Sequence, residues 1–416
     1  MKLKVRGKKH IEGEVKISGA KNSAVAVIPA AILTDDEVTL YNIPNISDVN
    51  IQINILNNHG YQTTFSNNTL TIKKKKKRKI STTLENDANL LRGSCYFIGA
   101  FLGKYKKIKM KAIGGCNFGP RPINYHIDAF MKMNAKYKDS LQFQILKTRK
   151  LKGAEINLDF PSVGTTINIL IGSVLAQGTT KINNAALEPE VVDVGNFLIA
   201  MGANISGLGT PNIEINGVKK LHGCSYSIIS DRIEAGTFLA IGALSDGDGI
   251  TVSNIEPLHL VSVTNALQKM GHKLDIYSDT IVIKKGESLN KINIETAPYP
   301  GFPTDLNPIF SVLLTQLPGI STIKENIFSD RTTHINELKN MGACITHKNN
   351  ITTIEGPTDL KYSYLVSKDL RCAASLLIAA LLSRCTTTID NIEYLLRGYE
   401  DIIHKLKTIN ITAKID

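Results

Sequence analysis

The stretch "GAKNSAVAVIPAAIL", residues 19–33, begins with a lysine and continues as an apolar helix that has no polar face. A helix that is apolar on all sides must be buried inside its domain. Five other stretches have the same order, a polar start followed by an apolar run: "LLRGSCYFIGAFLG" (90–103), "SVGTTINILIGSVLAQG" (162–178), "DRIEAGTFLAIGALSDG" (231–247), "PTDLNPIFSVLLTQLPG" (303–319) and "DLRCAASLLIAALLS" (369–383). The chain is therefore expected to contain six related buried helices.

The six stretches recur at a nearly constant spacing. One anchor residue in each gives spacings of 71, 73, 67, 73 and 66 positions, the anchors being Lys21, Arg92, Thr165, Arg232, Asp305 and Arg371. A period of this kind indicates internal repeats. Each repeat is predicted to hold a strand, the apolar helix, a strand, a turn often reading "NI", an amphipathic helix and two more strands, which is a βαβαββ unit.

The second helix of each repeat has one wet face. In "HINELKNMGA" (334–343), Ile335, Leu338 and Met341 form one apolar stripe. Three repeats can enclose one core of buried helices, with the sheets outside them, and six repeats build two similar halves. The predicted fold class is therefore α/β (α+β) with helices inside and sheets outside.

Bulk composition limits the function classes. With 416 residues, 43% of them hydrophobic, the chain can form two domains. Its longest apolar run, residues 372–382, is too short to span a bilayer, so no membrane association and a cytoplasmic location are expected. The six cysteines show no CxxC spacing, so neither a metal site nor a disulfide framework is expected.

The net charge of +12 is concentrated in one run. Lys73–Lys79, "KKKKKRK", carries seven cations, and subtracting them from +12 leaves +5. The run lies between "SNNTLTI" and "ISTTL", which are predicted to be a strand pair joined by a solvated turn. A patch that binds nucleic acid or an acidic partner is the alternative interpretation.

Cations also occur at the predicted N-termini of the buried helices, at Lys21, Arg92, Arg232 and Arg371. The positive end of a helix dipole favours anions, and burial of an unpaired charge is costly. Four cations at equivalent positions predict an anion-binding surface that opens onto a cleft. The alternative is that each cation pairs with a nearby carboxylate, such as Asp231 in the case of Arg232.

The segment "IGGCNFGPRP" (113–122) occupies a slot between the second strand and the second helix of its repeat. Repeats five and six have "NIFSDRTTH" (326–334) and "NIEYLLRGYE" (391–400) in this slot. Repeat equivalence therefore makes Cys116, Arg121, Arg331 and Arg397 counterparts. If the repeats converge, one thiol and three arginines reach the same cleft.

Seven segments together resemble a known family: "GAKNSA" (19–24), "GGCNFGPRP" (114–122), "PSVGTT" (161–166), "EPEVVDVGNFLIAMGA" (188–203), "DRIEAGTF" (231–238), "FPTDL" (302–306) and "RGYE" (397–400). Their order and spacing are similar, nearly end to end, to those of the UDP-N-acetylglucosamine 1-carboxyvinyltransferase family of enolpyruvyl transferases. The resemblance implies a two-domain inside-out α/β barrel with three repeats per domain. Residues 21–229 would form one domain, residues 1–20 and 230–416 the other, and the active site would lie between them.

The resemblance also implies a reaction. The enolpyruvyl group of phosphoenolpyruvate is transferred to the 3'-hydroxyl of UDP-N-acetylglucosamine through a tetrahedral intermediate, with release of phosphate, as the first committed step of peptidoglycan synthesis. This chemistry needs cations for the phosphate and carboxylate, a base for the hydroxyl proton and an acid that protonates C3. Asp305 is implied to be the base, and Cys116 the acid and the site of a covalent adduct. Lys21 and Arg397 are implied to be catalytic as well.

The same resemblance distributes the remaining residues between the two substrates. Phosphoenolpyruvate is assigned Lys21, Asn22, Arg121, Arg331, Arg371 and Arg397. UDP-N-acetylglucosamine is assigned Arg92, Arg121, Pro122, Ile123, Asn124, Tyr125, Ser162, Val163, Gly164, Asp305 and Ile327. Arg232 and Glu234 are interpreted as hinge and scaffold residues. No cofactor and no metal, a monomer, and a fosfomycin-type inhibitor that reacts at Cys116 are expected.

Two rival functions and one secondary prediction accompany this interpretation. A 5-enolpyruvylshikimate-3-phosphate synthase-like enzyme shares the fold and chemistry but lacks the cysteine loop. A nucleic-acid-binding or RNA-end-processing protein on a related fold is suggested by the pI of 9.2, although no nucleotide-cradling motif accompanies it. Most of the other five cysteines are expected to be buried small hydrophobes: Cys95, Cys224, Cys344, Cys372 and Cys385.

Overall fold

The computed structural model describes residues 1–416 apart from 9, 76–79, 85–91, 112–122, 141 and 384. The described chain divides into two compact units, each with its own hydrophobic core. One unit, called here the terminal unit, contains Met1–Ser18 and Ser230–Asp416. The other, called the middle unit, runs from Gly19 to Ile229.

Each unit contains three four-stranded sheets in the part of the chain that the structure describes. In the middle unit, the first sheet has the strand order β14 (Ser225–Ser227), β3 (Val38–Tyr41), β5 (Thr69–Lys74), β4 (Tyr61–Ser66). The second has the order β6 (Thr83–Leu84), β7 (Lys107–Met110), β9 (Gln144–Lys147), β8 (Lys136–Asp139). The third has the order β10 (Glu155–Asn157), β11 (Thr179–Asn183), β13 (Asn212–Asn216), β12 (Asn204–Ser206). In the terminal unit, one sheet has the strand order β22 (Tyr364–Val366), β23 (Thr386–Asp390), β1 (Lys2–Arg6), β24 (Ala413–Ile415). Another has the order β2 (Glu12–Lys16), β15 (Gly249–Ser253), β17 (Thr280–Lys284), β16 (Lys273–Ile276). The last has the order β18 (Asn293–Glu295), β19 (Gly319–Lys324), β21 (Ile351–Gly356), β20 (Cys344–Lys348).

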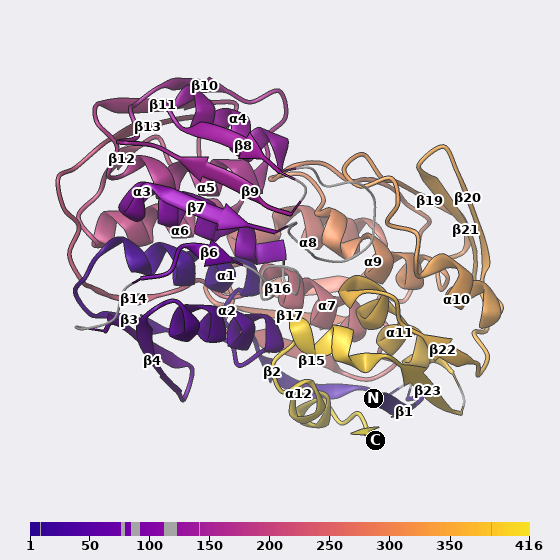
Figure 1. Ribbon diagram of the computed structural model, residues 1–416. Coiled ribbons are helices and arrows are strands. Elements are labelled where there is room, and N and C mark those ends of the chain that lie inside the picture. The colour runs from indigo at the N-terminus through magenta and orange to yellow at the C-terminus, as the bar shows by residue number, and fades with distance from the viewer. Residues whose placement is uncertain (9, 76–79, 85–91, 112–122, 141, 384) are drawn as a thin grey trace. The chain divides into compact units, whose positions relative to one another are not determined.

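All six sheets have the same topology. In each, the first two strands pair in parallel and the next two pairings are antiparallel. Three sheets are completed by strands from distant parts of the chain: β1 and β2 join the terminal unit, with Leu3 opposite Ile389 and Val15 opposite Val252, and β14 joins β3. The chain ends meet where β1 pairs with β24 (Figure 1). The predicted six-repeat βαβαββ fold, with helices inside and sheets outside, is confirmed.

An asparagine follows the second strand in four of the repeats, and in three of them it begins the predicted "NI" turn. These residues have left-handed backbones, with φ between 56° and 60°. Asparagine tolerates this conformation better than most side chains. Each amide also donates to the carbonyl oxygen just beyond the neighbouring parallel strand: Asn42 to Ile228, Asn184 to Leu158, Asn254 to Ile17 and Asn391 to Ser367. One local contact therefore joins two strands in each of these repeats.

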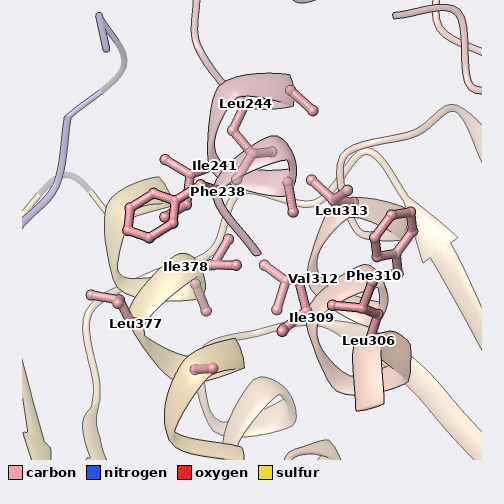
Figure 2. Packing of buried hydrophobic residues seen from close by; sticks show 14 of the residues in the cluster. Phe238, Ile241, Leu244, Leu306, Ile309, Phe310, Val312, Leu313, Leu377 and Ile378 are labelled. Atoms are coloured by element: carbon pink, nitrogen blue, oxygen red, sulfur yellow. The ribbon is translucent and has the colours of Figure 1, made fainter. Parts of the chain in front are cut away.

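The apolar helices form the centre of each unit. In the terminal unit, α7 (Arg232–Ala243), α9 (Asn307–Leu314) and α11 (Leu370–Leu382) pack together. Figure 2 shows side chains from all three pointing toward one another, including Phe238, Ile309 and Ile378, which are fully buried. The matching helices of the middle unit are α1 (Lys21–Ala30), α3 (Phe97–Tyr105) and α5 (Val163–Ser173).

The second helices cover the cores with one apolar face each. They are α2 (Ser47–Asn58), α4 (Asn124–Lys132), α6 (Pro189–Ala200), α8 (Val261–Lys269), α10 (Ile335–Asn340) and α12 (Ile402–Thr408). In α10, Ile335 and Leu338 are buried, and Met341 beyond its end is buried too, as the apolar stripe predicts. Among the described residues, every helix is too short or too polar to cross a membrane.

Two predictions about local features are wrong. The lysine run does not join a strand pair: β5 and β6 lie in different sheets, because β6 is the first strand of the next repeat. Lys73 and Lys74 belong to β5 and pair with the carboxylates of Glu37 and Asp35 at 3.3 and 2.9 Å, while residues 76–79 lie outside the described residues.

Most of the five secondary cysteines are not buried. Cys95 and Cys372 are buried, but Cys224 is half-buried, and Cys344 and Cys385 are exposed. Cys344 begins β20, whose side chains alternate between the core and the solvent, and it occupies an outward position. Strand register therefore sets the exposure of Cys344, which composition does not reveal.

Candidate active site

Predicted site residues occur where the central helices begin. Capping side chains fix several of these starts: Ser162 accepts from the Thr165 amide at α5, and Asp369 accepts from the Arg371 and Cys372 amides at α11. Asp231 caps α7 in the same way. A cap satisfies amides that a helix start leaves unpaired, so the polar residues at these starts have a defined backbone.

A cluster of predicted site residues joined by ion pairs lies in the terminal unit around Asp305. This residue lies in a short 3-10 helix, Thr304–Leu306, that leads into α9. One carboxylate oxygen is 2.5 Å from Nη1 of Arg331, and the other is 2.8 Å from Nη2 of Arg371. The arginine side chains are 4% and 10% exposed, whereas that of Asp305 is 24% exposed. Two predicted phosphoenolpyruvate ligands therefore contact the predicted base directly.

The charge environment of Asp305 follows from this geometry. Burial opposes ionisation, but the guanidinium groups of Arg371 and Arg331 outweigh it and hold the pKa of the Asp305 carboxyl well below its usual range. The carboxylate is therefore ionised at neutral pH. It is also a weak proton acceptor while both arginines remain in contact with it.

Arg397 is brought close to the same region by backbone packing. It ends the 3-10 helix Ile392–Arg397, and the next residue, Gly398, lies against the side chain of Leu370. A Cβ atom on Gly398 would be 2.8 Å from Cδ2 of Leu370, so only glycine fits without displacement. Since Leu370 precedes Arg371, the Arg397 segment is packed against the start of α11.

In the middle unit, Lys21 begins α1 and its Nζ lies 2.9 Å from Oδ2 of Asp48. Asp48 is fully buried in the first turn of α2, and Asn22 follows Lys21 in α1. Lys21 and Arg371 thus both have carboxylate partners, which agrees with the alternative interpretation of the helix-start cations. Paired cations can still bind an anion, because a second negative group can share the same donors.

The two segments predicted to bind the nucleotide sugar meet through His126. Ile123, Asn124 and Tyr125 lie at the start of α4, whereas Ser162, Val163 and Gly164 lie at the start of α5. A Cβ on Gly164 would be 3.3 Å from Cε1 of the His126 ring, and His126 Nδ1 is 2.8 Å from the amide nitrogen of buried Asn168. The amide oxygen of Asn168 accepts from the backbone of Gly99 in α3, so three helices share this polar contact.

Several predicted site residues cannot be placed in this geometry. Cys116, Arg121 and Pro122 lie outside the described residues. Arg92 begins a 3-10 helix, Arg92–Tyr96, in which Gly93 lies against Val25 of α1. The side chain of Arg92 lies outside the described part of the structure. Within the described residues, His, Cys, Asp and Glu form no group of three or more that could hold a metal ion.

The residues interpreted as scaffold make contacts of their own. The guanidinium carbon of Arg232 lies over the ring of Tyr299, 5.7 Å from the ring centre. Glu234 is buried and its Oε1 lies 2.6 Å from Nζ of Lys405. Burial raises the pKa of Glu234, and the charge of Lys405 opposes this shift.

Sequence reasoning missed the residues that complete these clusters. Asp48, His126 and Glu325 each contact a side chain that is distant in sequence: Lys21, Asn168 and Asn307, respectively. His126 directly follows the predicted Tyr125, but its partner Asn168 lies 42 positions away. Asp48 and His126 lie on amphipathic helices, where a buried polar side chain resembles an ordinary surface residue. Glu325 follows a strand and reads as a solvated turn. The one available signal in the sequence was a polar side chain, such as Asp48 or His126, at a helix position that the apolar periodicity predicts to be buried.

Comparison with known proteins defines the class. The family model described as "EPSP synthase (3-phosphoshikimate 1-carboxyvinyltransferase)" matches residues 5–406. Among solved structures, the enolpyruvyl transferase NikO from Streptomyces tendae superposes with a TM-score of 0.88 at 23% identity, covering 99% of this chain and 98% of its own. An EPSP synthase from Acinetobacter baumannii has a TM-score of 0.78 at 18% identity, covering 100% and 99%. These structures share the fold, and the class is that of the carboxyvinyl, or enolpyruvyl, transferases.

Curated relatives resolve the class further. UDP-N-acetylglucosamine 1-carboxyvinyltransferase 2 of Listeria monocytogenes serotype 4b is 44% identical over 99% of this chain and 97% of its own length. The protein of the same name from Bacillus subtilis is 41% identical over 99% and 96%. The chain therefore belongs to the UDP-N-acetylglucosamine 1-carboxyvinyltransferase family of enolpyruvyl transferases. This confirms the resemblance drawn from the sequence and favours it over a shikimate-directed enzyme.

Proposed function

We propose that the protein transfers the enolpyruvyl group of phosphoenolpyruvate to the 3'-hydroxyl of UDP-N-acetylglucosamine and releases phosphate. The observation that carries this proposal is the full-length similarity, at 41–44% identity, to relatives that bear this name. The product class makes the reaction a step of peptidoglycan precursor synthesis, with consequences for cell shape and division. A cytoplasmic location and a monomeric state belong to the same proposal.

Asp305 is proposed to accept the proton of the sugar hydroxyl. Its ionised carboxylate is consistent with this role, but two arginines make it a poor base until they are drawn away. Phosphoenolpyruvate carries a carboxylate and a phosphate that compete for Arg331 and Arg371. Binding of phosphoenolpyruvate would weaken both ion pairs and raise the pKa of Asp305. Asp305 would therefore become an effective base only when phosphoenolpyruvate, which the sugar hydroxyl attacks, is bound.

The chemical steps then balance as an addition followed by an elimination. The hydroxyl oxygen forms a bond to C2 of phosphoenolpyruvate, its proton passes to Asp305, and C3 takes a proton from the Cys116 thiol. In the second step C3 returns a proton to the Cys116 thiolate, the bond between C2 and the phosphate oxygen breaks with its electron pair going to that oxygen, and the departing phosphate takes the proton held by Asp305. Lys21, Arg121 and Arg397 would stabilise the departing phosphate, since positioned cations can do so directly.

The nucleotide sugar is proposed to contact the starts of α4 and α5. Support comes from the packing of His126 against Gly164, which holds these two segments together within the middle unit. Backbone amides at a helix start favour an anion such as a diphosphate. Ile327 and Asp305 are proposed as further contacts of the sugar.

A nucleic-acid function is not favoured by the described residues. Lys73, Lys74 and Lys104 pair with carboxylates of the same unit, which reduces the positive charge that a phosphate backbone would meet. Residues 76–79 of the lysine run lie outside the described residues.

A phosphate-release assay tests the proposed function. Release is expected when phosphoenolpyruvate and UDP-N-acetylglucosamine are both present, and not when either is omitted. Shikimate 3-phosphate in place of the nucleotide sugar is the matched control for the alternative enzyme. Release with shikimate 3-phosphate, or none with the proposed pair, would contradict the proposal.

A further inference from the structure

Glu325 is a buried carboxylate outside the set of predicted site residues. It directly follows β19 and is 3% exposed. Its Oε2 accepts hydrogen bonds from Oγ1 of Thr304 at 2.9 Å and from Nδ2 of Asn307 at 2.8 Å. Thr304 precedes Asp305, and Asn307 begins α9. One oxygen of Glu325 therefore holds the turn that carries the proposed base from both sides.

The other oxygen holds a different turn. Oε1 of Glu325 accepts from the backbone amides of Ile327 at 2.9 Å and Phe328 at 3.0 Å, and from Oγ1 of Thr296 at 2.8 Å. The ring of Phe328 faces the guanidinium of Arg331, with its centre 5.2 Å away, and the Phe328 carbonyl accepts from the Arg331 amide at 3.0 Å. Oε1 therefore fixes the turn that places Arg331.

Five donors occupy the two oxygens of the Glu325 side chain. A buried charge is costly unless hydrogen bonds replace its hydration, and Glu325 receives five. No lysine or arginine is among these five donors. Glutamine, which has the same shape, accepts through one oxygen only, so it would leave donors unmatched on its other arm.

We propose that Glu325 is a positioning residue that sets the placement of Asp305 relative to Arg331. Its two oxygens hold the two turns on which the members of this ion pair stand. The consequence for catalysis rests on the proposed function, because it assumes that Asp305 accepts the hydroxyl proton. A carboxylate that only stabilised the fold would lower stability when replaced but would leave the kinetics of the folded enzyme unchanged.

The test compares Glu325→Gln with Glu337→Gln in the full-length protein. Glu337 is a matched control, because it is also a buried carboxylate of the terminal unit and accepts from the Val366 amide. We expect Glu325→Gln to lower kcat on the order of 10- to 100-fold at temperatures well below its melting temperature, since small displacements of reacting groups have effects of this size. The acid limb of its kcat/KM–pH profile, which reports the free enzyme, should move to higher pH, because a loosened pair with Arg331 stabilises ionised Asp305 less. Glu337→Gln should change neither quantity.

Other outcomes are equally informative. A lower melting temperature with wild-type kcat and an unmoved acid limb would overturn the proposal. If Glu325→Gln does not fold, Thr304→Val removes a single hydrogen bond to Oε2, and the same kinetic change is expected at smaller size; wild-type kinetics would again overturn the proposal. If the wild-type protein releases no phosphate, the proposed function fails by itself. Crystal structures of wild type and variant then decide, since an unchanged Asp305–Arg331 geometry in the variant refutes the positioning role.

Discussion

Replacement of Lys405 by methionine should strongly destabilise the terminal unit. The Lys405 ammonium lies 2.6 Å from Oε1 of Glu234, and the two side chains are 11% and 2% exposed. It also donates to Oγ of Ser18 at 2.5 Å, and the Ser18 amide donates to Oε2 of Glu234 at 2.9 Å. Methionine fills a similar volume, so the loss is that of the charge and its hydrogen bonds.

The magnitude follows from what remains of Glu234. Breaking a buried ion pair by removing one partner costs about 3–5 kcal/mol, because the other charge stays buried. Glu234 can instead take up a proton. From its ordinary pKa of 4.5, this costs about 3.4 kcal/mol at pH 7 and about 0.7 kcal/mol at pH 5, at 1.36 kcal/mol per pH unit. The variant will take the less costly of these two routes, a buried charge or a protonated Glu234. Its free energy of unfolding should therefore fall by about 3 kcal/mol at pH 7.

The sign of the pH dependence is fixed. Burial raises the pKa of Glu234 in the folded protein, and the absence of Lys405 raises it further. A group with a raised folded pKa takes up a proton on folding, so the cost is absent below pH 4.5 and grows as pH increases. The variant should therefore lose less stability at pH 5 than at pH 7.

Urea denaturation followed by far-ultraviolet circular dichroism measures the free energy of unfolding at both pH values. Lys273→Met is the matched control, because Lys273 and Glu287 form an exposed pair of similar length, 2.7 Å, in the same unit. Exposed pairs contribute little, so this control should resemble the wild type. A loss below about 1 kcal/mol for Lys405→Met at pH 7, given the expectation from a buried pair, would refute the reasoning.

Three further predictions concern the reaction and the titration of buried groups. Cys116→Ala should abolish phosphate release, and fosfomycin should modify that thiol alone; mass spectrometry of the treated wild type showing a different labelled cysteine would count against its role. Asp305→Ala should lower kcat by about 10²- to 10⁴-fold, the usual contribution of a general base, and a variant that retains a tenth of the activity would remove Asp305 from this role. Burial lowers the pKa of His272 to about 4 and that of His334 to about 3, so both are neutral when folded. As pH falls below 6.5 the unfolded chain binds protons that these side chains exclude, and the free energy of unfolding should decrease. In His272→Asn, urea denaturation between pH 6.5 and 4.5 should show a shallower decrease, and an unchanged slope would contradict the assignment.

The repeat architecture was predictable because its signals are local. Apolar helices with no wet face, such as residues 369–383, and an asparagine in a left-handed turn recur in the sequence at a fixed period. Periodicity and turn chemistry act over a few residues, so they can be read without coordinates. The sheets completed by strands from distant parts of the chain were harder to predict from the sequence. The pairing of β1 with β23, for example, joins residues nearly 400 positions apart.

The site residues divide in the same way. Asp305, Arg331 and Arg371 were named from the sequence, and the structure brings the three into contact within one unit. Repeat equivalence pointed to Arg331 and Arg371, because matching positions in related repeats face a common region, whereas the family resemblance supplied Asp305. The role of each residue in the reaction is still a prediction, and Cys116 lies outside the described residues.

The sequence by itself determined the repeat, the inside-out arrangement of helices and sheets, and the identity of the charged residues at the helix starts. Only the tertiary structure decided which carboxylate meets which cation: Asp48 with Lys21, Glu234 with Lys405, and Asp305 with two arginines. The physical reason is range. Hydrophobic period and backbone conformation are properties of neighbouring residues, whereas the partner of a buried charge is set by packing between elements that the chain places far apart in sequence.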